Sequence, residues 1–314
     1  MNGAFWSVGE CMLELRPQSN GTIIHAAAGD SYNTAVYLKR LAPALPVRYV
    51  SALGDDAMSI LIRKHMRAER IDDSLVETRP GGTPGLYAIE TDANGERRFA
   101  YWRAQSAARS MLAAAHLSQL EAGLAQCRAL LLTGITLAIL DDGRRTALLA
   151  LAEKVRAAGG WVALDNNYRS ALWDAATAAQ WMDRATRACT HALFSFEDEA
   201  VLHGAGNSAQ ALQRIESLGV PEAALKLGAG GCLLGGAAVR TTVHVPAPEV
   251  QAVDTTAAGD SFNAGYLAQR LAGANAIRAA QFACTLAAAV VGHHGAIIPA
   301  HAMPPLPDTL SAEP

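Results

Sequence analysis

The chain has 314 residues, of which 51% are hydrophobic and 18% charged, and its formal net charge is -3. A chain of this length buries roughly three quarters of its extended surface, which is enough for one large core or two domains. Only four of its 26 basic residues are lysines, and the sequence offers no basic stripe for a polyanion. We therefore expect a globular protein that does not bind nucleic acid.

The sequence predicts neither a secretion signal nor a membrane span. Residues 1–7 lack the basic and apolar regions of a signal peptide, and the uncharged apolar stretches are shorter than the ~20 residues that a membrane helix needs. The five cysteines are scattered and contain no C-x-x-C pair, which argues against a disulfide framework or a structural zinc site. We expect a cytoplasmic protein with no membrane partner.

Strand-like apolar runs alternate with amphipathic helical segments along most of the chain. This alternation is typical of βαβ units, and it predicts an α/β fold with a doubly wound, mostly parallel sheet and helices on both faces. The clearest segments are a strand and helix at 47–53 and 58–67, a strand, helix and strand at 129–134, 143–158 and 161–165, a strand pair at 224–227 and 232–234, and two helices within 261–291.

One region departs from this alternation. Two alternating segments flank Asn94-Gly95, and Asn-Gly predicts a β-hairpin because both residues tolerate the positive φ of a type I′ turn. The strand period of two places Tyr101 and Arg103 on one face. We interpret the hairpin as part of a small β-sheet lid, formed discontinuously by about 12–27 and 83–104, on a single domain that spans 1–314.

The strongest chemical signal lies at residues 254–265, where small side chains precede a helix expected to start near Asp260. Small residues let backbone amides converge on one point, and a helix N-terminus adds about half a positive charge there. Such a segment can hold a phosphoryl group, and Asp260 beside it can accept a proton from an attacking hydroxyl. The alternative is that Asp260 only caps the helix.

Glycines at 228, 230 and 231 follow Lys226, and glycines allow a backbone to approach phosphates closely. The alternative is an ordinary glycine-rich hairpin turn. The segment does not lie at the start of a predicted helix, as a dinucleotide-binding motif must. The chain also contains no Gly-Lys dipeptide, which a Walker A loop requires. Any ATP binding must therefore use another type of site.

Taken together, these segments resemble the ribokinase (PfkB) family of sugar kinases nearly from end to end. The segment around Asp254 to Asp260 carries the family resemblance, whereas Tyr101-Trp102-Arg103 and the run that ends at Arg169 are similar to the subgroup that acts on sugar acids. The matching segments are Gly9 to Leu15, Gly29 to Thr34, Pro84 to Tyr87, Tyr101 to Arg103, Asp165 to Arg169, Asp254 to Ser261 and Gly295 to Pro299.

The resemblance implies a ribokinase-like fold and assigns roles to individual residues. It implies that Asp260 is the catalytic base and that Ala257, Ala258 and Gly259 form an anion hole. The expected substrate-binding residues are Gly29, Asp30, Asn33, Tyr87, Tyr101, Arg103, Arg169 and Asp260. The expected nucleotide-binding residues are Asn167, Lys226, Gly228, Gly231, Ala257 and Gly259. ATP and Mg²⁺ are implied, with a monovalent cation such as K⁺ as a further candidate.

The nature of the acceptor follows from two arginines. A neutral sugar needs no fixed cation, whereas the planar guanidinium of arginine can pair with both oxygens of a carboxylate. Arg103 lies on the hairpin beside Tyr101, and Arg169 follows a predicted strand that ends at Asp165, where ligands bind in open α/β sheets. A single arginine of this kind would be interpreted more simply as a solvated surface charge. Because both arginines lie in segments that match the family, they favour a sugar acid as the acceptor.

Three positions depart from the family pattern. Ala28-Gly29 replaces a common Gly-Gly pair, and Ala257 replaces a common glycine of the signature. The Asn of an Asn-x-x-Glu element associated with metal is missing at Phe196, although Glu199 is present. Glu199 is therefore a candidate to hold Mg²⁺ through water, with a solvated helix start as the alternative.

The implied activity is ATP-dependent phosphorylation of the C6 hydroxyl of 2-dehydro-3-deoxy-D-gluconate. Two alternatives remain open: a kinase for fructose, ribose or 2-keto-3-deoxygalactonate, and a sugar-acid sensor that keeps the fold but transfers nothing. An exposed edge of the lid can pair with the sheet of another subunit, so we expect a homo-oligomer.

Overall fold

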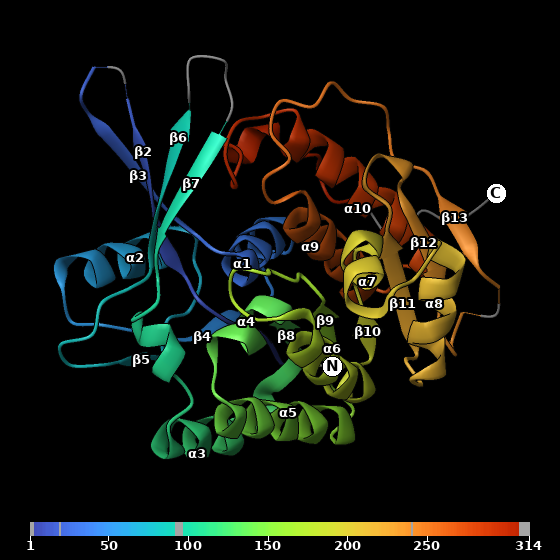
Figure 1. Cartoon of the computed structure of the whole chain (residues 1–314), viewed down its shortest axis with the longest axis horizontal. Coiled ribbons are helices and arrows are strands. Elements are labelled where there is room, and N and C mark those ends of the chain that lie inside the picture. Colours follow the sequence, from blue (N-terminus) through green and yellow to red (C-terminus); the bar gives the residue numbers. More distant parts are fainter. Residues whose placement is uncertain (1–2, 19, 92–96, 240, 308–314) are drawn as a thin grey trace.

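The structure, a computed structural model, describes residues 3–18, 20–91, 97–239 and 241–307. Its central sheet has the strand order β13-β12-β11-β10-β9-β8-β1-β4-β5 (Figure 1). All neighbours pair in parallel except β12, which is antiparallel to both β11 and β13. The strands are β1 Ala4–Val8, β4 Val47–Leu53, β5 Val76–Thr78, β8 Cys127–Thr133, β9 Trp161–Asp165, β10 His191–Ala192, β11 Glu222–Lys226, β12 Cys232–Gly235 and β13 Val243–Val245.

The central strands are apolar on both faces, because helices cover both sides of the sheet. In β8, Leu130 and Leu132 belong to the core on one side, whereas Ala129 and Leu131 belong to the core on the other. This alternation follows from the strand period of two, and a near-continuous apolar run is typical of a parallel strand buried on both faces. The predicted doubly wound α/β fold is confirmed.

The helices divide between the two faces. One core includes apolar side chains of α1, α2, α9 and α10, and the other includes those of α4, α5, α6 and α8. The helices are α1 Asp30–Leu41, α2 Ala57–Ala68, α3 Ala114–Ala122, α4 Gly134–Ile139, α5 Asp142–Ala157, α6 Ala175–Ala188, α7 Phe196–His203, α8 Ser208–Ser217, α9 Ala258–Leu271 and α10 Ala276–Val291, with 3₁₀ turns η1 Ala107–Ser110, η2 Leu124–Gln126, η3 Gly228–Gly230 and η4 Ala300–Ala302.

The predicted strands and helices are present, with small shifts in the residues at which they begin and end. The strand pair expected across the glycine-rich turn is β11 and β12, which pair in antiparallel register with Lys226 opposite Cys232. The two C-terminal helices are α9 and α10, and α9 begins at Ala258, two residues before the expected start. No helix within the described ranges combines the length and the apolar character needed to cross a membrane.

A second, smaller sheet stands away from the central one (Figure 1). It contains β3 Ile23–Ala28, β2 Met12–Pro17, β6 Leu86–Thr91 and β7 Arg97–Trp102, in that order. β2 runs antiparallel to β3 but parallel to β6, so the sheet joins two hairpins side by side. The predicted pairing of the two segments is confirmed, whereas the Asn94-Gly95 turn lies outside the described residues. That this sheet acts as a lid stays a prediction.

Candidate active site

A large cavity, of about 1410 Å³, lies beside the carboxyl ends of the parallel strands. Residues at the ends of β9 and β11, at the starts of α1 and α9, and on the small sheet line it. Ligands of open α/β folds bind at this edge of the sheet, because the loops that follow the strands converge there. This cavity is therefore the candidate active site.

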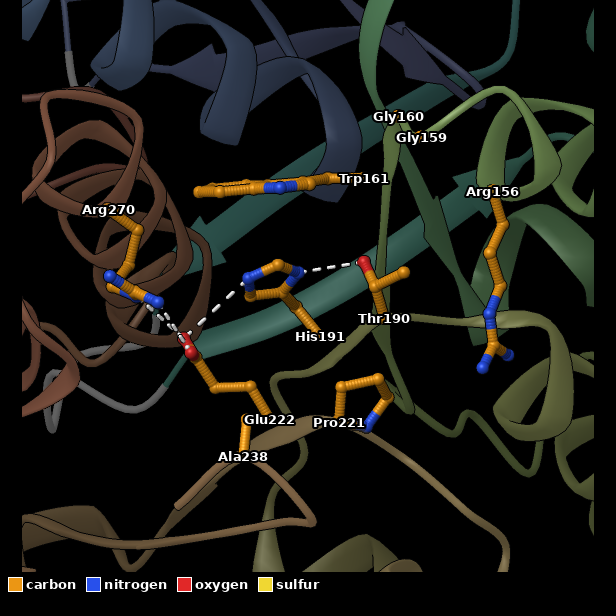
Figure 2. Close-up of a pocket in the computed structure, with 10 residues that line it drawn as sticks. All are labelled: Arg156, Gly159, Gly160, Trp161, Thr190, His191, Pro221, Glu222, Ala238 and Arg270. Atoms are coloured by element: carbon orange, nitrogen blue, oxygen red, sulfur yellow. Dashed lines mark hydrogen bonds and ion pairs between the residues drawn. The ribbon is translucent and has the colours of Figure 1, made fainter.

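A second cavity, of about 310 Å³, lies at the opposite edge, where β9, β10 and β11 begin (Figure 2). Arg270 donates to both carboxylate oxygens of Glu222 there, at 2.8 and 2.7 Å. The ring of His191 packs against Trp161 with centroids 4.3 Å apart and ring planes tilted by 37°, and burial lowers the pKa of His191 to about 4. An imidazole with a pKa of about 4 and a carboxylate held by an arginine are both weak bases near neutral pH, so we assign the chemistry to the larger cavity.

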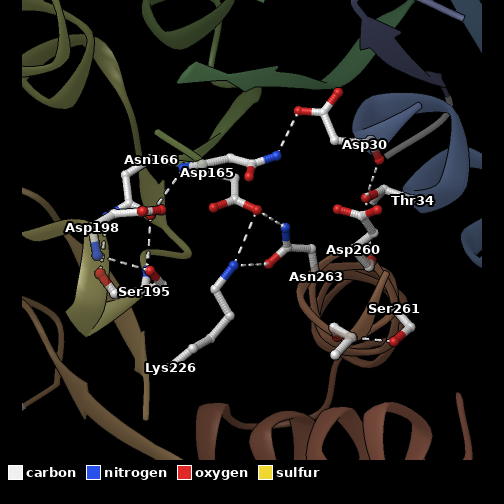
Figure 3. Close-up of polar contacts among 12 residues, drawn as sticks. Asp30, Thr34, Asp165, Asn166, Ser195, Asp198, Lys226, Asp260, Ser261 and Asn263 are labelled. Atoms are coloured by element: carbon white, nitrogen blue, oxygen red, sulfur yellow. Dashed lines mark hydrogen bonds and ion pairs between the residues drawn. The ribbon is translucent and has the colours of Figure 1, made fainter. Parts of the chain in front are cut away.

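Asp260 lies in the first turn of α9 and lines the larger cavity (Figure 3). Its Oδ2 accepts a 2.8 Å hydrogen bond from Asn33 Nδ2, and the Thr34 hydroxyl donates to its backbone carbonyl at 3.2 Å. Burial and, after it, the nearby Asp30 carboxylate raise the pKa of Asp260 to about 8. A carboxylate whose pKa lies near the working pH is well matched to act as a general base.

The same side chain does not cap the helix. The N-cap position of α9 is Ala257, which makes no side-chain capping bond, and the Asp260 carboxylate points instead to Asn33 on α1. The alternative in which Asp260 serves only as a helix cap is therefore wrong.

Main-chain donors stand next to Asp260. Ala257, Ala258 and Gly259 all line the cavity at the start of α9, where first-turn amides have no carbonyl partner within the helix. The Ala258 amide donates to the Thr255 carbonyl of the preceding loop at 3.2 Å. Asp254, which is buried, fixes the preceding loop, since its carboxylate accepts from the amides of Thr256 at 3.0 Å and Gly295 at 2.6 Å. This arrangement can bind the oxygens of a phosphoryl group.

A lysine that is paired with a buried carboxylate lies next to these main-chain donors. Lys226 Nζ donates to Asp165 Oδ2 at 3.0 Å and to Asn263 Oδ1 at 3.2 Å, and Asn263 Nδ2 donates to the same Asp165 oxygen at 2.6 Å (Figure 3). A Cβ added to Gly259 would lie 3.4 Å from Lys226 Nζ. The ammonium group is thus adjacent to the start of α9, with its position set by two side chains.

The backbone geometry of the turn after Lys226 explains why it is rich in glycine. Gly228 and Gly231 have φ values of 57° and 86°, and a Cβ on Gly231 would lie 2.0 Å from the carbonyl oxygen of Val245. The hairpin therefore requires glycine there whether or not it binds a nucleotide. Both glycines also line the cavity, so the two interpretations of this turn are compatible.

The small sheet contributes the opposite wall of the cavity. Tyr87 and Tyr101 face each other across β6 and β7, with ring centroids 5.7 Å apart. Arg103 follows β7 and forms an ion pair with the buried Glu10, whose other carboxylate oxygen has no hydrogen-bond partner in the described residues. A Cβ on Gly29 would lie 2.3 Å from the Glu10 carbonyl oxygen, which explains the glycine.

Three further predicted residues complete this part of the cavity. Asn167 Nδ2 donates to Asp30 Oδ2 at 2.8 Å, which links the segment after β9 to the start of α1. Arg169 is exposed, and its Nη1 donates to the carbonyl of Tyr168 at 2.8 Å. The cavity therefore holds carboxylates, amides and guanidinium groups in one space.

A model of the pfkB family carbohydrate kinases matches residues 6–303 of the chain. The chain belongs to this family. As a carbohydrate kinase it is a phosphotransferase, and a solved PfkB protein from Polaromonas sp. JS666 is 26% identical, covers 92% of this chain and 96% of its own, and has a TM-score of 0.80. The predicted family and ribokinase-like fold are confirmed.

Curated relatives are more similar in sequence. The 2-dehydro-3-deoxygluconokinase of Dickeya dadantii is 41% identical over 302 residues, which are 95% of this chain and 97% of the relative. The 2-dehydro-3-deoxygluconokinase of Haemophilus influenzae is 37% identical over 295 residues, with 93% and 94% covered.

The structure brings all but one of the predicted kinase site residues to this cavity. Glu199 is the exception: it lies buried in α7, where its Oε2 accepts from Arg214 Nη1 at 3.0 Å, and it does not line the cavity. Burial raises the pKa of Glu199 to about 7. The alternative of a solvated helix start is wrong for this residue, while its neighbours Glu197 and Asp198 do line the cavity.

Other residues in or directly beside the cavity were not predicted from the sequence. Asp165 and Asn263 hold Lys226. Asp165 lies inside a segment that matches the family, so its position was an available signal, whereas Asn263 lies just beyond the matching segment that ends at Ser261. Glu10 likewise lies in a matching segment, but pairing it with Arg103 requires the fold. Arg109 also lines the cavity, and nothing in the surrounding sequence distinguishes it from a surface arginine.

Proposed function

We propose that this kinase transfers the γ-phosphoryl group of ATP to the C6 hydroxyl of 2-dehydro-3-deoxy-D-gluconate, giving 2-dehydro-3-deoxy-6-phospho-D-gluconate and ADP. The observation that carries the proposal is the 41% identity over 95% of the chain to a curated kinase of that name. Arginines at the acceptor end of the cavity support an acidic acceptor, because a guanidinium group matches a carboxylate.

In this mechanism the chain's own residues activate the hydroxyl and stabilise charge. Asp260 takes the proton of the C6 hydroxyl while that oxygen forms a bond to the γ-phosphorus and the bond to the β–γ bridging oxygen breaks. Main-chain amides at Ala257 to Gly259, with Lys226 beside them, stabilise the negative charge on the transferring group. Asp260 then releases its proton to solvent.

Closure of the small sheet would exclude water from this step. Its inner side already supplies Tyr87 and Tyr101 to the cavity, so a bound sugar acid would contact both the sheet and α9. Excluding water limits the transfer of the phosphoryl group to water in place of the sugar.

Magnesium would reach the site with the nucleotide. The described residues contain no cluster of three or more acidic, histidine or cysteine side chains able to hold a metal ion by themselves. Mg²⁺ commonly keeps several waters and binds one or two carboxylates together with substrate phosphates, which suits Glu197 and Asp198. When bound, the ion neutralises phosphate charge.

A requirement for K⁺ is a separate question, which is tested by replacing K⁺ with choline in the assay.

A coupled ADP-release assay over a panel of substrates tests the proposal. The panel contains 2-dehydro-3-deoxy-D-gluconate, its galactonate epimer, fructose and ribose. We expect the gluconate compound to have the highest kcat/KM and the Asp260→Asn variant to lose roughly 10²–10⁴-fold in kcat. Fastest turnover of a neutral sugar would contradict the assigned acceptor, and no ADP release with any compound would favour a sensor.

The same proposal bears on assembly and location. Ile23 and Ile24 on β3 and Trp102 on β7 are large apolar side chains that are exposed at the outer strands of the small sheet. We propose that a second copy covers them in a homo-oligomer, which light scattering in solution would measure. The use of ATP supports a cytoplasmic location.

A further inference from the structure

Two of the five cysteines lie together beside the glycine-rich turn. Cys232 is the first residue of β12, directly after that turn, and Cys284 lies in the middle of α10. Both belong to the core on the same side of the sheet, where α10 packs against β12. The Cys232 thiol donates a hydrogen bond to Cys284 Sγ. The two sulfur atoms are therefore in contact, although the residues are far apart in the sequence.

Cys284 is the cysteine that the active-site cavity reaches. All five cysteines are free and buried, but of the five only Cys284 lines this cavity. Ala287, Ala288 and Val291 line it as well, and their spacing from Cys284 places all four residues on one face of α10. A small reagent that enters the cavity can thus meet the Cys284 sulfur, even though the residue is only 3% exposed.

The cysteines differ in how easily they ionise. The hydrogen bond from Cys232 favours the thiolate of Cys284 and lowers the pKa of Cys284, although burial opposes this effect. The same bond, together with burial, raises the pKa of Cys232. Burial likewise raises the pKa of Cys11, Cys127 and Cys189. Because the thiolate is the reactive form, we expect Cys284 to be the most reactive cysteine of the chain.

The two cysteines belong to two walls of one part of the cavity. Cys232 follows Gly231 and pairs with Lys226 across the hairpin of β11 and β12. Gly228 and Gly231 line the cavity, so the glycine-rich turn and the face of α10 that carries Cys284 border the same space. We assign that space to the nucleotide. A covalent bond between the two sulfur atoms would fix the turn relative to α10.

We propose that Cys284 is a site of reversible oxidation, and that a disulfide between Cys284 and Cys232 lowers the affinity of this kinase for ATP. The oxidant is a peroxide. The Cys284 thiolate attacks one peroxide oxygen, the O–O bond breaks, and hydroxide leaves, which converts Cys284 to a sulfenic acid. Cys232 then gives up its proton and attacks the Cys284 sulfur, so that the S–S bond forms and the second oxygen leaves as water. This inference rests on the proposed use of ATP.

The disulfide would change the shape of the nucleotide site. Its sulfur atoms lie about 2 Å apart, which is closer than two unbonded thiols can approach. Bond formation therefore draws α10 towards the start of β12 and moves the cavity wall that carries Cys284. Bound ATP would in turn cover Cys284 and keep peroxide away from it. Because the two effects are linked, a disulfide that weakens ATP binding must itself be disfavoured by bound ATP.

The test treats the reduced full-length kinase with hydrogen peroxide, in the presence and absence of ATP. In the wild type we expect mass spectrometry of the peptides to find Cys232 joined to Cys284. We expect kcat/KM for ATP to fall by roughly 10²-fold, because a displacement of about 1 Å in a binding wall is enough for such a loss. Dithiothreitol should reverse both changes, and ATP present during the treatment should slow them.

Two variants separate the disulfide from other effects of peroxide. Cys232→Ser should match the wild type before treatment, because Cys232 does not line the cavity. After treatment its Cys284 should stop at the sulfenic acid, which dimedone traps, with a much smaller loss of kcat/KM for ATP. Cys189 lies in the core on the other side of the sheet, so Cys189→Ser is the matched control and should respond to peroxide as the wild type does.

The outcomes distinguish this inference from the proposed function. Peroxide that leaves both thiols free, or a disulfide that leaves kcat/KM for ATP unchanged, overturns the inference while the proposed function stands. An equal loss of kcat/KM in Cys232→Ser overturns the role of the disulfide in the same way. If the untreated wild type shows no turnover with ATP, the proposed function fails and the effect on ATP fails with it, whereas the mass spectrum still shows whether the disulfide forms.

Discussion

Asn33 Nδ2 donates a 2.8 Å hydrogen bond to Asp260 Oδ2, joining the first turn of α1 to the first turn of α9 across 227 residues of sequence. The bond favours the ionised form of Asp260, whereas burial and Asp30 favour the neutral form and prevail. The balance sets the pKa of the proposed base at about 8. The availability of this base near neutral pH therefore depends on a residue outside the α9 segment.

Removing that donor should shift the pH dependence of the reaction. In the wild type we expect kcat/KM to rise with pH up to about 8, because only the ionised Asp260 accepts a proton. Asn33→Leu removes a hydrogen bond to the carboxylate, so the pKa of Asp260 rises and the acid limb moves up by about one pH unit. Profiles of kcat/KM against pH measure the shift.

Thr34→Val is the matched control for this experiment. Thr34 donates to the backbone carbonyl of Asp260 and not to its carboxylate, so its variant should leave the acid limb in place. Equal shifts in both variants would mean that local packing, and not the hydrogen bond, sets the pKa of Asp260.

Asp260→Asn should make the ligand-free protein more stable near pH 8 while reducing kcat. The pKa of Asp260 is raised from 3.8 to about 8 in the folded chain, so the folded state holds a proton that the unfolded state has released. This group therefore lowers stability as pH rises from about 4 to about 8, and a neutral amide lacks this effect. Melting temperatures at pH 5 and pH 8 should show the stabilisation mainly at the higher pH. A variant that melts lower at pH 8 would contradict it.

The sequence predicted the fold and most of the candidate site, because both depend on local patterns. The βα alternation, the apolar β8 and the small residues before α9 all act over short distances along the chain. The two sheets likewise followed from the pattern of strands, although the parallel pairing of β2 with β6 did not. That pairing joins segments far apart in the chain, and no local signal specifies its direction.

The sequence did not predict which acidic side chains pair with which arginines. Arg103 has the residue type that binds a carboxylate, but the structure shows that Glu10, from another matching segment, already pairs with it. Glu199 has the residue type that binds a metal, yet Arg214 on α8 pairs with it below the cavity surface. In both cases the residue type was informative, whereas its electrostatic state depends on a partner distant in sequence.

Lys226→Met separates a role in folding from a role in nucleotide binding. Among the residues that the structure describes, loss of the ammonium leaves the buried Asp165 with Asn263 as its remaining side-chain donor, so we expect stability to fall by about 3 kcal/mol. KM for ATP should also rise. Adding Asp165→Asn removes the uncompensated charge and should restore most of the stability but not the affinity for ATP. Chemical denaturation and steady-state kinetics measure the two effects, and recovery of both would confine Lys226 to a structural role.

Ala257 carries a backbone strain that glycine would relieve. Its φ is 61°, a left-handed conformation that costs an L-residue with a Cβ about 1–2 kcal/mol. Ala257→Gly removes that cost but adds flexibility to the unfolded chain, worth about 0.4–1 kcal/mol, so we expect a net stabilisation of about 0.5 kcal/mol. Ala258→Gly, one residue further on and inside α9, should instead destabilise by about 0.5–1 kcal/mol, because it gains the same flexibility with no strain to relieve. Denaturation midpoints of the two variants should therefore move in opposite directions, and a shared downward shift would show that the left-handed turn at Ala257 costs the protein nothing.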